Sequence, residues 1–171
     1  MAISTATVKT ALRIDYTDDD AEFTRLIAAA VAWVERYTNV GLSSATRTLK
    51  LATWADAVLP VDPFTSLTSV TYYDSSNVLT TMPSTDYWVD VSGDMPRIRF
   101  LEFPATYEGT NMTVTYVAGH ATEPADMVQA VISIVGAWYN NPEATQPIAL
   151  NTVPLGALYL LDHYRVKGPF S

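Results

Sequence analysis

Residues 17–41 read TDDDAEFTRLIAAAVAWVERYTNVG, and this stretch carries the clearest helical pattern in the sequence. Its apolar side chains recur at intervals of three and four residues, which is the spacing of one face of an α-helix. They are Phe23, Leu26, Ile27, Ala30, Val31, Val34 and Tyr37. Thr17 or Asp18 is suited to the N-cap, acidic residues favour the first turn, and Gly41 can end the helix.

Helical patterns also occupy both ends of the chain. Before residue 17, Ser4 or Thr5 can cap a shorter helix. Towards the other end, Pro124 is expected at the first position of a helix that is apolar on nearly all sides. Residues 153–164 predict a final helix, which follows a loop rich in Pro, Gln and Asn.

The middle of the chain, residues 42–118, has a different pattern. Thr, Val and Tyr become frequent, and Pro, Gly and short polar runs interrupt them. Alternation and β-branched content predict strands at 46–53, 67–73, 78–81, 87–91, 97–100 and 111–117. The run Asp74-Ser75-Ser76-Asn77 predicts a hairpin turn between two of these strands. Short strands separated by turns favour a small antiparallel sheet or sandwich over parallel β-α-β units.

This order of elements predicts an α+β protein. We expect a helical core of two N-terminal and two C-terminal helices, with a small antiparallel β insertion between them. A length of 171 residues suggests one domain. The expected layout is a single domain over 1–171, with helices at 4–40 and 123–165, the insertion at 42–118 and a short tail at 166–171.

Composition and charge exclude several functional classes. The chain has 10 Lys+Arg against 18 Asp+Glu, a net charge of −8, which argues against a grip on nucleic acid or on anionic membranes. It has no cysteine, which excludes disulfides, thiol nucleophiles and Cys-ligated metals. The opening MAISTATVKT lacks the apolar core of a secretory signal, and Met127–Pro142 is too short for a membrane span. We therefore expect a soluble protein that is intracellular at synthesis.

Residues suited to catalysis or metal binding are few. His163 stands alone and His120 has only Glu123 beside it, whereas a zinc site usually needs three or four ligands. The acidic run from Asp15 cannot form an EF-hand loop, because Asp20 stands where that loop requires glycine. Nucleophile-elbow, phosphate-loop and dinucleotide motifs are also missing. We predict no catalytic residues, no metal, no cofactor and no enzymatic activity.

Several segments, spread over nearly the whole chain, carry a pattern that is more specific together than singly. They are VKTALRIDYTDDDAEF at 8–23, LIAAAVAWVERYTNVGL at 26–42, LTSVTYYD at 67–74, DYWVD at 86–90, VTYVAG at 114–119 with the following Glu123-Pro124, AWYNN at 137–141 and LDHYRV at 161–166. In this order they resemble the head–tail connector, or adaptor, proteins of tailed phages.

The resemblance implies a structural virion protein of the phage neck. Such proteins form a ring of about twelve copies under the portal, extend the DNA channel and dock the next neck or tail component. The implied partners are other copies of the chain, the portal protein and a stopper or tail-completion protein. Phage DNA would pass through without sequence-specific binding, and no membrane is involved. The implied location is the head–tail interface of the virion, with assembly in the host cytoplasm.

Two sets of residues are candidates for these contacts. Small side chains and an apolar helix suit packing between copies, and the interface candidates are Ala28, Ala29, Ala32, Ile134 and Ala137. A basic tail with an apolar tip suits docking on the portal, although a frayed terminus is the alternative. The portal-binding candidates are Arg165, Val166, Lys167, Pro169 and Phe170.

Other functions stay open at the level of sequence. The first alternative is a stopper or tail-completion protein of the same neck, although helices at both ends favour the connector, because tail-completion proteins are more often mainly β. The others are a small soluble enzyme, which would show a pocket with perturbed titratable groups, and a monomeric binding module without large apolar patches.

Overall fold

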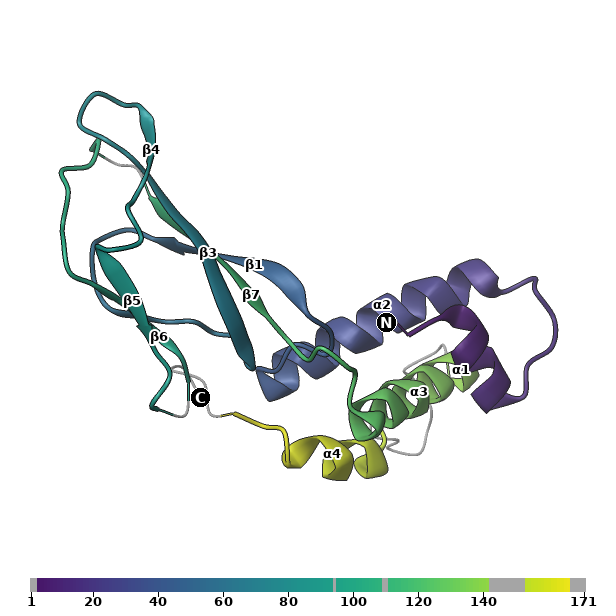
Figure 1. The fold of residues 1–171 in the computed structure, drawn as a ribbon. Helices are drawn as coiled ribbons and strands as arrows, with labels where there is room; N and C mark the ends of the chain where they lie inside the picture. Colours follow the sequence, from purple (N-terminus) through teal and green to yellow (C-terminus); the bar gives the residue numbers. More distant parts are fainter. Residues whose placement is uncertain (1–2, 94, 109–110, 142–152, 167–171) are drawn as a thin grey trace. The chain divides into compact units, whose positions relative to one another are not determined.

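The computed structural model describes residues 3–93, 95–108, 111–141 and 153–166. The chain divides into two compact units, shown in Figure 1. The helical unit comprises Met1–Ser43 and His120–Arg165, and the β unit comprises Ser44–Gly119 and Val166–Ser171. The helical unit therefore brings together segments from the two ends of the chain.

The predicted helices are confirmed in the helical unit. They are α1 (Thr5–Leu12), α2 (Asp20–Thr38), α3 (Ala125–Asn140) and α4 (Leu155–Asp162). Ser4 caps α1 as expected, because its Oγ accepts a hydrogen bond from the backbone N–H of Thr7 at 3.1 Å. Pro124 is the N-cap of α3 and not its first helical residue.

The ends of α2 differ from the prediction by one or two residues. Asp19 occupies the N-cap position, in place of Thr17 or Asp18. The helix stops before Asn39, which adopts the left-handed conformation with φ 59°. Asparagine tolerates this conformation better than most residues. The C-cap predicted for Gly41 is therefore wrong, because Asn39 ends the helix earlier.

The core of the helical unit forms where α3 packs against both α2 and α4 (Figure 1). This double packing explains why α3 is apolar on nearly all sides. The fully or almost fully buried side chains of α2 and α3 are Phe23, Leu26, Ile27, Ala30, Val34, Met127, Ala130, Val131, Ile132, Ile134 and Val135. Val8 of α1 and Leu161 of α4 complete the core, each with no exposed surface.

The β unit contains two antiparallel sheets. The larger has the order β1 (Ala45–Leu51), β7 (Met112–Ala118), β3 (Phe64–Tyr73), β4 (Leu79–Thr81). The smaller has the order β2 (Ala57–Val58), β6 (Arg97–Phe100), β5 (Tyr87–Asp90). In the larger sheet Val114 of β7 lies opposite both Leu49 and Val70, which places apolar residues on one face.

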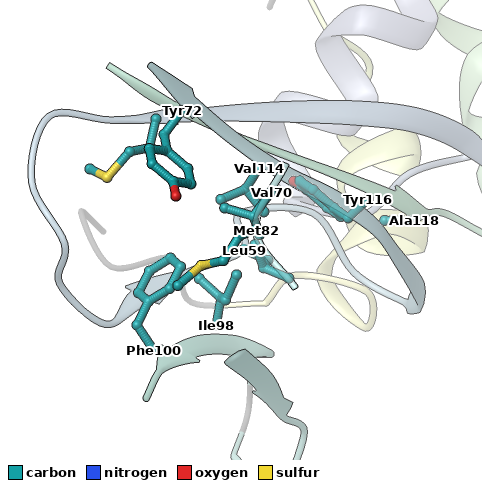
Figure 2. Packing of buried hydrophobic residues seen from close by; sticks show 10 residues of the cluster. Leu59, Val70, Tyr72, Met82, Ile98, Phe100, Val114, Tyr116 and Ala118 are labelled. Atoms are coloured by element: carbon teal, nitrogen blue, oxygen red, sulfur yellow. The ribbon is translucent and has the colours of Figure 1, made fainter. Parts of the chain in front are cut away.

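One apolar core lies between the two sheets, as Figure 2 shows. Both sheets contribute to it, and Leu59 and Met82 join it from outside the strands. Its buried members are Leu59, Val70, Tyr72, Met82, Ile98, Phe100, Met112, Val114, Tyr116 and Ala118. Trp54 packs edge-on against Tyr72 and Phe100, with ring centroids 5.3 and 5.1 Å apart.

The turn between β3 and β4 forms as predicted. The carboxylate of Asp74 accepts hydrogen bonds from the backbone N–H groups of Ser76 and Val78, at 2.9 and 3.0 Å. Asn77 adopts a left-handed φ of 61°, which tight turns require. Asp74-Ser75-Ser76-Asn77 therefore closes the hairpin by side-chain to backbone bonding.

The α+β class is confirmed, but the β part is not the small insertion that the sequence predicted. Its described residues form two sheets with a buried core of their own. Such a core requires two layers, and the second layer includes the long-range pairing of β2 with β6, in which Ala57 lies opposite Ile98. Strand patterns in sequence do not reveal which strands share a sheet.

Candidate interaction surfaces

A hollow of about 380 Å³ lies along one flank of α2. The helix supplies residues that are three or four positions apart, so that they share one face. The α2 hollow is lined by Ile3, Thr24, Ile27, Ala28, Val31, Ala32, Glu35, Leu42, Ser43 and Glu123. Ala28 and Ala32 contribute small side chains to this lining, and Ile27, Val31 and Leu42 contribute larger aliphatic ones.

Hydrogen bonds at both ends of α2 hold the walls of the hollow. At one end, the hydroxyls of Thr5 and Thr24 lie 3.3 Å apart, which ties the start of α1 to α2. At the other end, the Glu35 carboxylate accepts a hydrogen bond from the backbone N–H of Leu42 at 3.0 Å. The hollow is therefore built by contacts that do not depend on a partner.

The structure separates the predicted interface residues. Ala28 and Ala32 line the α2 hollow, whereas Ala29 is exposed but does not line it. Ala137 on α3 is half-buried. Ile134 has no exposed surface and lies in the core of its own chain, so its side chain is not available for a subunit interface. The apolar pattern of α3 could not distinguish packing within the chain from packing between copies.

A second apolar feature lies on α4. Leu155 is 56% exposed and Tyr159 is 73% exposed, and one helical turn separates them. The opposite side of the helix is buried through Ala157 and Leu161. We call the exposed pair the α4 knob. The sequence predicted the helix but not this exposed pair, because apolar residues lie on more than one side of so short a helix.

The start of the predicted portal-binding tail is held against α2. The guanidinium of Arg165 lies 5.3 Å from the ring centroid of Tyr37, which itself stacks on Trp33 at 5.1 Å. The Tyr37 hydroxyl donates to the Asp162 carboxylate at 2.7 Å, and this bond raises the pKa of Tyr37. Val166 follows as a half-buried residue.

The rest of the tail candidates, Lys167, Pro169 and Phe170, lie outside the described residues.

A partly exposed hydrogen-bond network joins the acidic run to α3. Tyr139 donates its hydroxyl hydrogen to Asp19 at 2.6 Å, so Tyr16, whose oxygen lies 2.5 Å from that of Tyr139, is the donor in the second bond. The hydrogen bond to Asp19 is the main reason why the pKa of Tyr139 is strongly raised. The ring of Tyr139 also packs on Phe23, with centroids 4.5 Å apart. The network therefore connects the start of α2 to the end of α3.

The neighbouring acid, Asp20, has a different partner. Its carboxylate accepts a hydrogen bond from Lys9 of α1 at 2.5 Å. Asp19 and Asp20 thus bind helices together, whereas the sequence predicted only an N-cap and favourable acidic residues in the first turn. Lys9 stands eleven residues earlier, and that separation gives no periodic signal.

The β unit also exposes apolar side chains around its hairpin. Tyr73 and Leu79 lie opposite each other on β3 and β4, and Tyr107 donates its backbone N–H to the carbonyl of Tyr73 at 2.9 Å. All three side chains are exposed, as is Val78 in the turn. On the smaller sheet, Trp88 is exposed beneath the guanidinium of Arg99, 5.8 Å from its ring centroid.

Arg99 contacts two carboxylates and one aromatic ring of the β unit. It donates to Asp56 at 2.6 Å and to Asp90 at 3.2 Å. Hydrogen bonds from Ser92, with a further contribution from Arg99, lower the pKa of Asp90. This arrangement orders the edge of the smaller sheet.

The two histidines lie apart in the helical unit. The ring of His120 packs edge-on against Tyr164, with centroids 6.3 Å apart, while His163 is the exposed C-cap of α4. In the described part of the chain, no three His, Asp or Glu side chains are grouped closely enough to hold a metal ion. The described helices also include none that is long and apolar enough to cross a membrane.

Comparison with known proteins identifies the family. The model of the Head completion protein family matches residues 2–154, so the chain belongs to this family. Membership confirms the resemblance to phage head–tail proteins that the sequence motifs indicated. No curated protein sequence is significantly similar to this one.

Solved structures share the fold. A chain in the neck of an empty gene transfer agent particle, computed with C6 symmetry, is 24% identical, with a TM-score of 0.80 over 97% of this chain and 90% of that chain. A chain in the virion of the native gene transfer agent particle gives the same values. A chain in the native neck computed with C12 symmetry is 23% identical, with a TM-score of 0.74 and the same coverage.

Proposed function

We propose that the chain is a structural component of the neck of a tailed phage or phage-like particle. The observation that carries this proposal is the family match over residues 2–154, and the fold shared with chains of gene transfer agent necks supports it. In this role the protein assembles as a ring under the portal, extends the DNA channel and docks the next neck or tail component. The role is non-enzymatic and belongs to the head–tail interface of the virion, after assembly in the host cytoplasm.

Features of the surface support assembly into a ring. Only 16% of the residues are charged, against about 25% in a typical soluble domain. The helical unit offers both a hollow and an exposed apolar pair, which are different surfaces. Contacts between different surfaces repeat head to tail, and they close into a ring when the rotation between copies allows it. Related necks were computed with C6 and C12 symmetry, and a ring of about twelve copies is consistent with that.

The first experiment is to mix the purified chain with the portal assembly encoded in the same genome. Co-sedimentation followed by mass measurement should show a saturating complex with one copy per portal subunit. A chain that stays monomeric and does not bind the portal would contradict the connector role. A repeat with the portal already carrying its adaptor would then show whether the chain binds one step further along the neck.

The C-terminal tail is our candidate for portal binding, through Arg165, Val166, Lys167, Pro169 and Phe170. The described start of the tail supports this, since the guanidinium of Arg165 packs on the ring of Tyr37 and so anchors the start of the tail to α2. Deletion of residues 166–171 should abolish or strongly weaken portal binding, and Phe170→Ala should account for much of the loss. Ser171→Ala is the matched control, and unchanged binding after the deletion would remove the tail from the interface.

A ring of this chain would offer DNA an acidic passage. The net charge of −8 per copy repels phosphates, so DNA can pass without being held. Substitution of Asp by Asn, or of Glu by Gln, on the helix that faces the channel in the assembled ring should slow DNA ejection. Normal ejection kinetics in such particles would count against an acidic lumen.

The second candidate is a stopper or tail-completion protein of the same neck. The two-sheet β unit favours it, because it is larger than the insertion expected of a connector. This candidate predicts that the chain binds the connector instead of the portal, and therefore joins the assembly only when the portal already carries its adaptor.

A further inference from the structure

The larger sheet ends in a long and regular strand at one edge. β1 is its terminal strand, and β7 is the strand with which it pairs in the described chain. All seven residues of β1 pair with β7 without a register shift. In the described part of the chain, the backbone groups of Thr48, Leu49 and Lys50 bond to no segment other than β7. The outward row of N–H and C=O groups on such a strand is a template for a further strand.

The other edges of the two described sheets are short or irregular. β4, β2 and β5 contain three, two and four residues. β3 extends past β4, but register shifts interrupt that stretch between Phe64 and Ser66 and between Leu67 and Ser69. Short strands and bulges are common means by which proteins prevent strand addition at an edge. β1 has neither feature, so it is the edge best suited to accept another strand.

The inward side chains of β1 also favour a further strand. The residues of β1 alternate between half-buried and exposed, and the half-buried set includes Leu49 and Leu51. Both pack against the core between the sheets, whereas their neighbours on β7, Val114 and Met112, are 0% and 2% exposed. A strand added beside β1 would cover apolar surface that Leu49 and Leu51 leave open, which is favourable.

We propose that β1 pairs with β1 of a second copy, antiparallel and about a two-fold axis at Thr48. In this register all seven residues overlap, and Thr48 lies opposite Thr48 of the other copy. The remaining pairs are Arg47 with Leu49, Thr46 with Lys50 and Ala45 with Leu51. Half-buried residues therefore lie opposite half-buried ones and exposed residues opposite exposed ones, as the pleat of a sheet requires.

The other registers of this pairing are less favourable. A shift of one residue places inward-facing side chains opposite outward-facing ones. An axis at Arg47 or at Lys50 sets like charges directly opposite each other, which is destabilising. An axis at Leu49 pairs only residues 47–51 of the strand. The strand is thus self-complementary in the one register that uses its whole length, and this property identifies a second copy as the occupant of the edge.

This contact belongs to the free protein. A two-fold contact uses the same surface on both copies and closes with two of them, whereas a ring needs two different surfaces. The pairing covers the β1 edge before assembly, when an open edge invites aggregation. It does not rest on the proposed function, and the two are tested separately.

Disulfide cross-linking tests the pairing directly, because the chain contains no cysteine. Thr48→Cys places thiols on directly opposite residues, whose Cα atoms lie about 4.5–5.5 Å apart in an antiparallel pair, within the range of a disulfide. The matched control is Thr115→Cys, because Thr115 lies opposite Thr48 on β7 and is one strand further from the edge. One strand spacing in each copy separates the two control residues by about 10 Å more.

Purified Thr48→Cys protein should form a cross-linked dimer under mild oxidation without portal, and Thr115→Cys protein should not. Equal amounts of dimer from the two variants would overturn the proposal. Portal binding by the wild-type chain is measured independently, so failure of the β1 contact leaves the proposed function standing.

A second measurement is independent of thiol chemistry. Sedimentation of the wild-type chain over a series of concentrations should show a monomer–dimer equilibrium. Thr48→Lys sets two like charges opposite each other and should weaken dimerisation about fivefold, whereas Thr68→Lys adds the same charge on β3 and should not. Both positions are exposed, so the fold should tolerate either lysine. A wild-type chain that is monomeric at every concentration, or equal dimerisation of the two variants, would show that β1 does not pair in this way.

Discussion

At the residue scale, Tyr139 shows how one side chain can join distant parts of the helical unit. Its hydroxyl binds Asp19 and Tyr16, which lie 120 and 123 positions earlier in the sequence. Its ring packs on Phe23 in the same region. A pattern of apolar residues predicts that this position faces the core, but the hydroxyl contacts depend on how α2 and α3 lie together.

The raised pKa of Tyr139 gives a prediction about alkaline stability. The folded state favours the neutral phenol of Tyr139. Its contribution to the free energy of unfolding is therefore fully present below the unfolded pKa of 10.0 and is lost as pH rises above that value. Wild-type protein should therefore lose more stability than Tyr139→Phe as pH rises from 9 to about 11. Urea unfolding at several pH values measures this.

The exposed Tyr159 provides the control for this experiment. Tyr159→Phe should follow the wild-type pH dependence, because the variant keeps the bonds of Tyr139. If the free energy of unfolding fell equally with pH in wild type and in Tyr139→Phe, the role assigned to the Asp19 bond would be contradicted.

Gly136 gives a second prediction at this scale. Alanine favours a helix over glycine by about 1 kcal/mol, but its Cβ would lie 2.8 Å from a flexible methyl of Leu12. We expect these effects to offset, so that Gly136→Ala changes the free energy of unfolding by less than about 1 kcal/mol. Gly136→Val should destabilise by about 1–3 kcal/mol, because its branches meet the same side chain.

A double-mutant cycle checks the cause. With Leu12→Ala in the background, Gly136→Val should cost clearly less, because the obstructing methyl is gone. An unchanged cost in that background would show that Leu12 is not what limits the size of residue 136.

At the scale of elements, the β unit depends on contact between its two sheets. Leu59 lies between the strands in sequence, donates its backbone N–H to the carbonyl of Pro96 at 2.9 Å and has no exposed surface. It belongs to the same core as Ile98 of the smaller sheet and Val70 of the larger. A residue outside the strands thus helps to hold the two layers together.

Leu59→Ala should lower the free energy of unfolding by about 2–5 kcal/mol, through lost burial and the cavity left behind. Denaturant unfolding followed by tryptophan fluorescence measures it, because Trp54 packs against this core. Leu79→Ala is the control, since Leu79 is exposed on β4 and should change stability by less than about 0.5 kcal/mol. A similar loss in both variants would mean that Leu59 does not fill the core as described.

At the scale of the whole molecule, charge sets the relation to nucleic acid. With 10 basic against 18 acidic residues, the chain cannot release many phosphate counterions on binding. We predict no retention of duplex DNA at physiological salt in a gel-shift or anisotropy experiment, with or without assembly on the portal. DNA binding whose affinity falls steeply as the salt concentration rises would contradict the idea of a passive channel.

The sequence by itself determined the helices at both ends, the strand-rich middle, the turn at Asp74-Ser75-Ser76-Asn77 and the family. These features follow from local spacing, turn chemistry and the order of motifs, which are all written along the chain. The sequence also pointed to Ala28 and Ala32 on α2, because small residues at helical spacing stand out.

Only the tertiary structure decided which apolar faces are covered. It placed Ile134 inside the core, paired the strands into two sheets, joined Asp20 to Lys9 and left Leu155 and Tyr159 exposed on α4. Burial and long-range pairing depend on which elements meet in space. An apolar pattern is the same whether its partner is the chain itself or another copy, and the three-dimensional contacts make that distinction.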